Sequence, residues 1–306
     1  MIEAENLTKK FGDTTAVEGL TFHVNPGEIF GFLGPNGAGK TTTVRMLTCL
    51  ISMTSGSARV GDYEVGDPKD SNAIRKMIGL VPDNVGLYEA LSPHENLDFY
   101  GKLYERSEAQ RKEAIERLLR LLGLWEQRNL PVGAFSKGMK QKVAVARAMI
   151  HDPPVLFLDE PTANLDPESA KTVRDFILGL KGENKTIFLN THNLDEAQRI
   201  CDRIGILNTR LVTVGTPAEL EESVAGKKVV IQLERVTESI LGAVRGLGLQ
   251  NLAVDGTRLT IDVADPESEN PAIVDAILAA GGRVQFVSRL NPTLEDAYLK
   301  FVRHPP

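Results

Sequence analysis

The chain has 306 residues, of which 42% are hydrophobic and 25% are charged, and its formal net charge is −6. The length corresponds to about two domains, and the composition is that of a core-forming globular protein. The negative charge argues against a general affinity for nucleic acid, so no nucleic acid is expected among its partners. No segment approaches the roughly 20 apolar residues that a membrane-spanning helix needs.

The first motif in chain order, residues 34–41, has the form G-x-x-x-x-G-K-[ST] of a phosphate-binding P-loop. It follows an apolar run at 28–33 that predicts a buried strand, and it precedes residues 42–47, which predict a helix. The glycines allow a tight turn whose N–H groups face an anion. Lys40 would contact the β- and γ-phosphates, and the Thr41 hydroxyl would bind Mg²⁺. The alternative is a glycine-rich turn without a ligand, which the flanking strand and helix disfavour. The predicted nucleotide-binding residues are Gly34, Pro35, Asn36, Gly37, Ala38, Gly39, Lys40, Thr41 and Thr42.

Strand and helix patterns alternate through the first part of the chain, which predicts an α/β fold with a largely parallel sheet. Residues from about 85 to 149 break this alternation. Within them, residues 108–122 repeat apolar side chains at helical spacing. The pattern therefore predicts an all-helical insertion between two strands of the sheet.

Residues 155–160 form an apolar run that ends in two acids, Asp159 and Glu160. A P-loop ATPase places at the first of these positions the acid that holds Mg²⁺, commonly through water. Glu160 would leave the strand end in another direction and polarise the water that attacks the γ-phosphorus. The alternative is that both acids only cap the turn before Pro161. The P-loop earlier in the chain favours the catalytic interpretation.

The last part of the chain predicts a second, smaller domain. We place the boundary near residues 223–227, so that the domains span 1–225 and 226–306. Further strands of the first domain are expected at 185–190, 203–207 and 211–214. The second domain shows a β-α-β-β-α-β order, compatible with a ferredoxin-like unit, at residues 228–233, 239–247, 252–254, 259–263, 271–280 and 284–288, followed by a helix at 294–302. It carries no cluster of chemically reactive residues, which favours a packing or docking module.

Taken together, these motifs resemble the ATPases of ABC transporters. Residues 135–141, Phe-Ser-Lys-Gly-Met-Lys-Gln, resemble the signature sequence of that family. Residues 164–167 resemble its D-loop, and residues 190–193 its histidine switch. With the P-loop and the acidic strand, five elements occur in the family's order between residue 1 and about residue 220. The resemblance implies a P-loop ABC ATPase core with an α-helical subdomain, next to the small α+β domain.

The resemblance also implies roles for particular residues. Ser136 and Gly138 would hold the γ-phosphate of ATP bound to a second copy, so that MgATP closes two copies head to tail. His192 would contact the γ-phosphate and orient the attacking water. Phe11, expected before the first strand, lies where the family stacks an aromatic ring on adenine. The alternative for Phe11 is an ordinary core phenylalanine.

Some residues depart from the family's usual pattern. Asp83 stands where glutamine usually contacts Mg²⁺ and relays contacts to the membrane subunit. A carboxylate is a good ligand for Mg²⁺, but it is shorter and charged. Lys137 and Met139 replace the usual glycine and glutamine of the signature. This variant, together with residues 291–299, resembles the ATP-binding subunits of drug-resistance and related exporters.

The expected function is therefore that of the ATPase subunit of an exporter. It would lie in the cytoplasm, on the inner face of the plasma membrane, and drive a separate membrane-spanning permease as a homodimer or with a paired ATPase subunit. The alternative is a soluble ABC ATPase that remodels ribosomes or nucleic acid. The single P-loop, the lack of long coiled-coil heptads and the negative charge disfavour this alternative.

Overall fold

The computed structural model describes residues 1–224, 228–289 and 292–303. The described chain divides into two compact units. Met1–Pro217 and residues 301–303 belong to the first, and Ala218–Lys300 form the second. The boundary expected at residues 225 and 226 lies outside the described residues, as does Asn291 at the start of the predicted exporter-like ending. Among the described residues, no helix has the length and apolar character required to cross a membrane.

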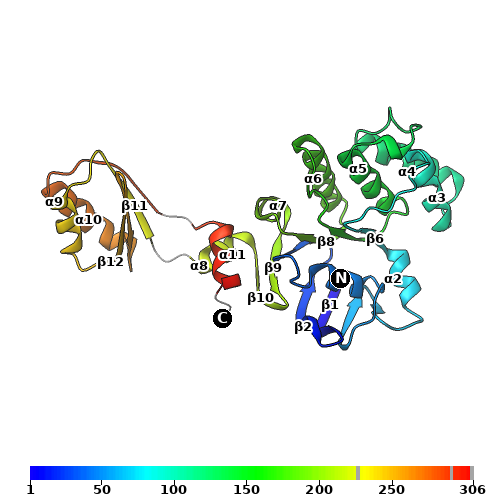
Figure 1. Cartoon of the computed structure of the whole chain (residues 1–306), viewed down its shortest axis with the longest axis horizontal. Coiled ribbons are helices and arrows are strands. Elements are labelled where there is room, and N and C mark those ends of the chain that lie inside the picture. The colour runs from blue at the N-terminus through cyan, green and yellow to red at the C-terminus, as the bar shows by residue number, and fades with distance from the viewer. Residues whose placement is uncertain (225–227, 290–291, 304–306) are drawn as a thin grey trace. The chain divides into compact units, whose positions relative to one another are not determined.

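Two sheets build the first unit (Figure 1). The smaller sheet is antiparallel and has the order β2-β1-β4-β5. Its strands are β1 Ile2–Phe11, β2 Thr14–Val24, β4 Ser55–Val60 and β5 Tyr63–Glu64. The larger sheet has the order β10-β9-β3-β8-β7-β6 and is parallel except for its edge strand β10. Its strands are β3 Ile29–Leu33, β6 Ile78–Val81, β7 Val155–Asp159, β8 Thr186–Thr191, β9 Arg203–Asn208 and β10 Arg210–Gly215.

A shared apolar core fixes the two sheets together. The ring of Phe22 on β2 lies 5.0 Å, between centroids, from that of Phe32 on β3, and Phe32 lies 4.9 Å from Phe188 on β8. Val44 and Leu47 of helix α1 (Lys40–Leu47) belong to the same core. Because β3 and α1 are both anchored in this core, the P-loop between them has fixed ends.

Helices alternate with the strands of the larger sheet along the chain, as the sequence predicts. Between β6 and β7 the chain forms only helices: α3 Pro93–Leu103, α4 Glu108–Leu121, the 3-10 helix η1 Val132–Ala134 and α5 Lys137–Met149. This is the expected α-helical insertion. Ser92 and Ser107 begin α3 and α4 with capping boxes, in which the serine side chain and a residue three positions later satisfy each other's backbone N–H groups. The remaining helices are α2 Ser71–Met77, α6 Pro167–Gly182 and α7 Leu194–Ile200.

The second unit has the predicted ferredoxin-like order. Its sheet is antiparallel with the order β12-β13-β11-β14, and helices α9 and α10 share its core. The elements are β11 Lys228–Leu233, α9 Glu238–Arg245, β12 Gln250–Asp255, β13 Arg258–Asp262, α10 Pro266–Ala279 and β14 Val284–Arg289, with helices α8 Pro217–Val224 and α11 Leu294–Arg303 outside this order.

Helix α10 begins five residues earlier than the sequence pattern predicts, at Pro266 rather than at Pro271. The Asp265 side chain accepts a hydrogen bond from the N–H of Glu267 at 3.4 Å and so caps the helix. Pro266 at the first helical position needs no hydrogen-bond partner. Pro271 inside the helix removes one backbone hydrogen bond, but burial of Ile273 and Ile277 stabilises the part of the helix that follows it.

Candidate functional site

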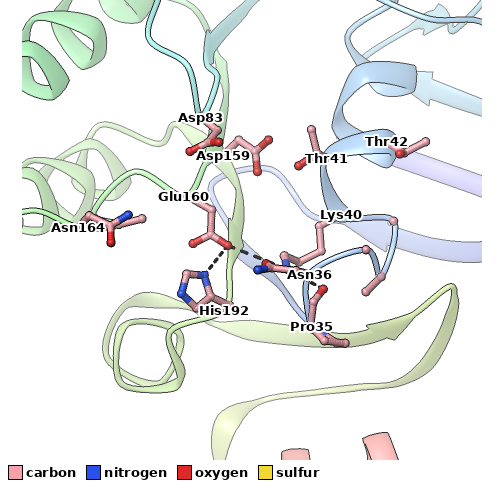
Figure 2. A pocket seen from close by; sticks show the side chains of 14 residues that line it. Pro35, Asn36, Lys40, Thr41, Thr42, Asp83, Asp159, Glu160, Asn164 and His192 are labelled. Carbon is pink, nitrogen blue, oxygen red and sulfur yellow. Dashed lines mark hydrogen bonds and ion pairs between the residues drawn. The ribbon is translucent and has the colours of Figure 1, made fainter. Parts of the chain in front are cut away.

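Adjacent parallel strands bring the predicted motifs to one edge of the larger sheet. In the order β3, β8, β7 and β6, their carboxyl ends lead into the P-loop, His192, Asp159-Glu160 and Asp83. Ligands of open α/β sheets bind at this edge. A pocket lies there (Figure 2), lined by Pro35, Asn36, Gly37, Ala38, Gly39, Lys40, Thr41, Thr42, Asp83, Asp159, Glu160, Ala163, Asn164 and His192.

The P-loop glycines stand where the backbone or its neighbours exclude a side chain. Gly39 has a φ of 99°, in the left-handed region, and a Cβ there would lie 2.6 Å from the Ala16 carbonyl oxygen. A Cβ on Gly34 would lie 2.3 Å from the Leu207 carbonyl oxygen. The loop therefore packs against the smaller sheet and against β9, and only glycine fits at these two positions.

Lys40 is held by the loop that precedes it. Its Nζ atom donates hydrogen bonds to the carbonyl oxygens of Gly34 at 2.6 Å and of Pro35 at 3.2 Å. The side chain is buried, and burial lowers the pKa of Lys40, while the nearby carboxylate of Glu160 opposes this change. The ammonium group is therefore fixed at the pocket wall, where a phosphate would compensate for its lost hydration.

Glu160 faces two cationic or ionisable groups. Its Oε1 atom lies 2.8 Å from Nδ1 of His192 and 4.0 Å from Nζ of Lys40. The backbone of Glu160 has a φ of 52°, so its side chain leaves the strand end in a different direction from that of Asp159, as the sequence predicts. The Glu160 side chain is 15% exposed and His192 is 57% exposed, so both can reach a molecule in the pocket.

The residues predicted to bind Mg²⁺ line the same pocket. Thr41, Asp83 and Asp159 offer a hydroxyl and two carboxylates, which are hard oxygen donors of the kind that Mg²⁺ prefers. Asp159 is nearly buried, and its Oδ1 atom accepts a hydrogen bond of 3.1 Å from the Asn190 side chain. The described residues contain no group of three or more His, Cys, Asp or Glu that could hold a metal by itself. Since Mg²⁺ usually keeps waters and substrate phosphates as ligands, this donor set fits MgATP.

Four predicted residues do not line the pocket: Gly34 at the start of the P-loop, Ser136, Gly138 and Phe11. Ser136 and Gly138 stand at the start of α5, where the Ser136 hydroxyl accepts a hydrogen bond from the N–H of Met139 at 3.2 Å. A Cβ on Gly138 would lie 2.4 Å from Oγ of Ser169, so this glycine also allows α5 to pack on α6. Phe11 is the last residue of β1, so the expectation that it precedes the first strand is wrong. Phe11 as a whole is 52% exposed, which also excludes a core role.

Asn164 and Asn190 contribute to the site beyond the predicted set. Asn164 lines the pocket with a φ of 57°, and Asn190 orients Asp159 from the neighbouring strand. Both belong to motifs visible in the sequence, but only strand pairing shows that Asn190 lies opposite Asp159.

Known proteins resemble this chain along nearly its whole length. Residues 17–163 match the family described as ABC transporter. The chain is 34% identical to the linearmycin resistance ATP-binding protein LnrL of Bacillus subtilis, over 91% of this chain and 89% of that protein. It is 36% identical to the Nod factor export ATP-binding protein I of Rhizobium sp., over 98% of this chain and 96% of that protein. Among solved structures, a dimeric ATP-binding cassette in a post-hydrolysis state with ADP and Pi superposes with a TM-score of 0.65. The two chains are 26% identical, and the match covers 71% of this chain and 98% of the other.

Proposed function

The chain belongs to the ABC transporter family of ATP-binding subunits, and on this premise we propose that it hydrolyses MgATP to drive an exporter. The observation that supports this most strongly is the position of Glu160, whose carboxylate lies between Lys40 of the P-loop and His192 in a single pocket. The names of the relatives, which describe drug resistance and Nod factor export, favour an exporter over an ATPase that remodels ribosomes.

In this proposal the charged and catalytic side chains of the pocket have separate tasks. The P-loop N–H groups and Lys40 bind the β- and γ-phosphates. Thr41, Asp159 and Asp83 would hold Mg²⁺, which would neutralise charge on the phosphate oxygens. Glu160 accepts a proton from the attacking water as the water oxygen bonds to the γ-phosphorus. The bond from that phosphorus to the bridging oxygen of ADP breaks in the same reaction. His192 orients the water and the γ-phosphate.

Two copies would complete the site. Ser136 and Gly138 lie outside the pocket of their own chain, at the first turn of α5, where free N–H groups favour an anion. We assign them to the γ-phosphate of ATP bound to the opposite copy, in a head-to-tail dimer. Phe11, exposed at the end of β1, is assigned to the adenine ring.

The permease would contact a groove next to the nucleotide pocket. Pro82 lines this groove together with Leu50, Tyr100 and Arg147. Asp83, the next residue, lines the nucleotide pocket. A movement of this loop would therefore change both the groove and the nucleotide pocket. The proposed location, at the inner face of the plasma membrane beside a separate membrane-spanning subunit, rests on membership of the family.

Phosphate release from MgATP by the whole chain tests this function. Glu160→Gln keeps the shape of the side chain but removes its basicity, so turnover should fall at least about 100-fold while nucleotide still binds. The matched control is Glu183→Gln, because Glu183 is 47% exposed and pairs with Arg117 away from the pocket. If Glu160→Gln hydrolysed ATP at the parent rate, Glu160 would have no part in the reaction.

A further inference from the structure

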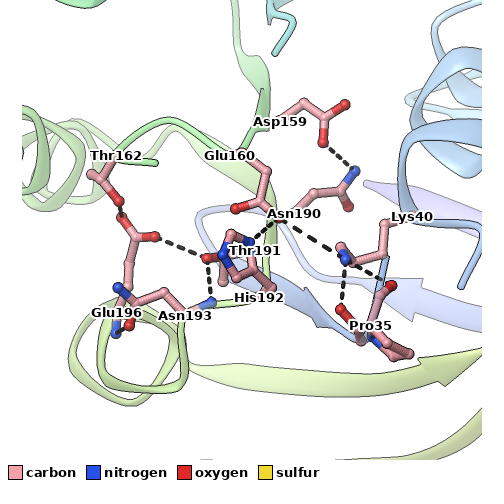
Figure 3. Close-up of polar contacts among 11 residues, drawn as sticks. Pro35, Lys40, Asp159, Glu160, Thr162, Asn190, Thr191, His192, Asn193 and Glu196 are labelled. Atoms are coloured by element: carbon pink, nitrogen blue, oxygen red, sulfur yellow. Dashed lines mark hydrogen bonds and ion pairs between the residues drawn. The ribbon is translucent and has the colours of Figure 1, made fainter. Parts of the chain in front are cut away.

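A buried carboxylate, that of Glu196 on α7, joins the two segments that carry Glu160 and His192. Its Oε1 atom accepts a hydrogen bond from the Thr162 hydroxyl at 2.6 Å, and its Oε2 atom accepts one from the Thr191 hydroxyl at 3.0 Å (Figure 3). Thr162 lies two residues after Glu160, and Thr191 immediately precedes His192. Glu196 thus bridges the loop that follows β7 and the carboxyl end of β8.

Burial makes this arrangement costly for the charged carboxylate. Glu196 is 2% exposed, and burial raises the pKa of its carboxyl group. The hydrogen bonds from Thr162 and Thr191 and the positive charge of Arg174 oppose this rise. A buried polar group that is fully bonded rigidifies its surroundings, whereas removal of one partner leaves the others unsatisfied.

The cap of helix α7 does not require this carboxylate. The Asn193 side chain already accepts a hydrogen bond from the N–H of Glu196 at 3.1 Å. The N–H of Asn193 in turn donates to the Thr191 hydroxyl at 3.0 Å. His192 therefore lies between two residues that are tied to Glu196, while its own Nδ1 atom faces Glu160.

We propose that Glu196 is a positioning residue for ATP hydrolysis, which sets the distance between His192 and Glu160 through the hydroxyls of Thr191 and Thr162. The inference rests on the proposed function. Glu196 does not line the nucleotide pocket, so its effect is on the geometry of the hydrolytic pair and not on binding. A displacement of about 1 Å in a catalytic group can lower a rate by about 100-fold.

Four variants of the whole chain separate this role from a merely structural one. Glu196→Ala should lower kcat by roughly 10- to 100-fold and change the Kd for MgATP by less than about threefold. Glu196→Gln keeps the shape of the side chain. Its amide can bond both hydroxyls if one of them accepts a hydrogen bond from the NH2 group instead of donating, so this variant should retain most of the parent kcat. Thr162→Val, which removes one donor at constant shape, should lower kcat, and Thr162→Ser, which retains it, should not.

A double variant tests whether Glu196 acts through His192. In a His192→Ala background, Glu196→Ala should lower kcat by less than about threefold, because the His192–Glu160 pair whose distance it sets no longer exists. An effect as large as that in the parent background would overturn the inference. A Glu196→Ala protein with the parent kcat would also overturn it, and so would one in which kcat and MgATP binding are lost in parallel. Failure of the proposed function is distinguishable, since the parent chain itself would then release no phosphate.

Discussion

Nδ1 of His192 lies 2.8 Å from Oε1 of Glu160, although 32 positions separate the two residues in the sequence numbering (192 − 160). The contact forms because β7 and β8 are parallel neighbours and end at the same edge of the sheet. The same carboxylate oxygen lies 4.0 Å from Nζ of Lys40, which follows β3 on the other side of β8. One oxygen thus faces groups from the ends of two other strands, and this supports its assignment as the base.

Lys40→Met should weaken binding of MgATP by at least about 100-fold, because it removes the charge that the P-loop presents to the phosphates. Isothermal titration calorimetry with MgATP measures this directly. Lys171→Met, at an exposed position of α6, is the control and should bind as the parent does. Equal affinities of the parent and Lys40→Met would remove Lys40 from the phosphate site.

Gly39→Ala should abolish nucleotide binding and lower the free energy of unfolding by more than about 2 kcal/mol, since both its φ of 99° and the Ala16 carbonyl oxygen exclude a Cβ. Gly12→Ala provides the matched control. Gly12 also has a positive φ, 57°, but nothing lies within 4 Å of the position of its Cβ. Urea unfolding and calorimetry should show a modest stability loss and intact binding for Gly12→Ala. Equal behaviour of the two variants would show that close packing does not constrain the P-loop.

Asp83→Asn should raise the Mg²⁺ concentration needed for half-maximal phosphate release several-fold, because an amide is a weaker ligand than a carboxylate. Asp13→Asn, at an exposed position between β1 and β2, controls for the loss of one surface charge. An unchanged Mg²⁺ requirement in Asp83→Asn would mean that Asp83 is not a ligand of the ion.

Acid should destabilise the fold through His151, which burial holds at a pKa of about 4, below the ordinary value of 6.5. Its ring stacks on Tyr104 with centroids 3.7 Å apart, and Nε2 lies 3.0 Å from the Ile78 carbonyl oxygen. Because the folded pKa is lowered, the unfolded chain binds the proton first, and stability is lost as pH falls from 6.5 towards 4. Between pH 7 and pH 5, the free energy of unfolding of His151→Phe should therefore rise by about 2 kcal/mol relative to that of the parent. A difference that does not change with pH in urea unfolding would contradict this.

The sequence predicts those parts of the site that lie within short motifs. The P-loop, Asp159 and Glu160 are recognisable because local spacing alone constrains them, and the structure places them in one pocket. Glu196 is different. The spacing Asn193-x-x-Glu196 is that of a capping box, so a local interpretation assigns the carboxylate to the helix end. Its bond to Thr162, 34 residues away, depends on strand pairing that no local pattern contains.

Predicted element boundaries were wrong where tertiary packing decides. The sequence pattern predicts a helix from Pro271, yet the helix begins at Pro266 and contains Pro271, with Ile273 and Ile277 buried after it. The sequence pattern places Phe11 before the first strand, but it ends β1. In contrast, the order of elements in the second unit followed correctly from alternating strand and helix patterns.

The most direct test of the account is the oligomeric state of Glu160→Gln protein, measured by light scattering with and without MgATP. The account predicts a monomer without nucleotide and a dimer with it, because bound ATP that is not hydrolysed should hold Ser136 of one copy against the phosphates of the other. Adding Ser136→Ala should prevent dimer formation, at a cost of only about 1 kcal/mol to the α5 cap. A monomer under both conditions, or a dimer that forms equally without MgATP, would contradict the shared site.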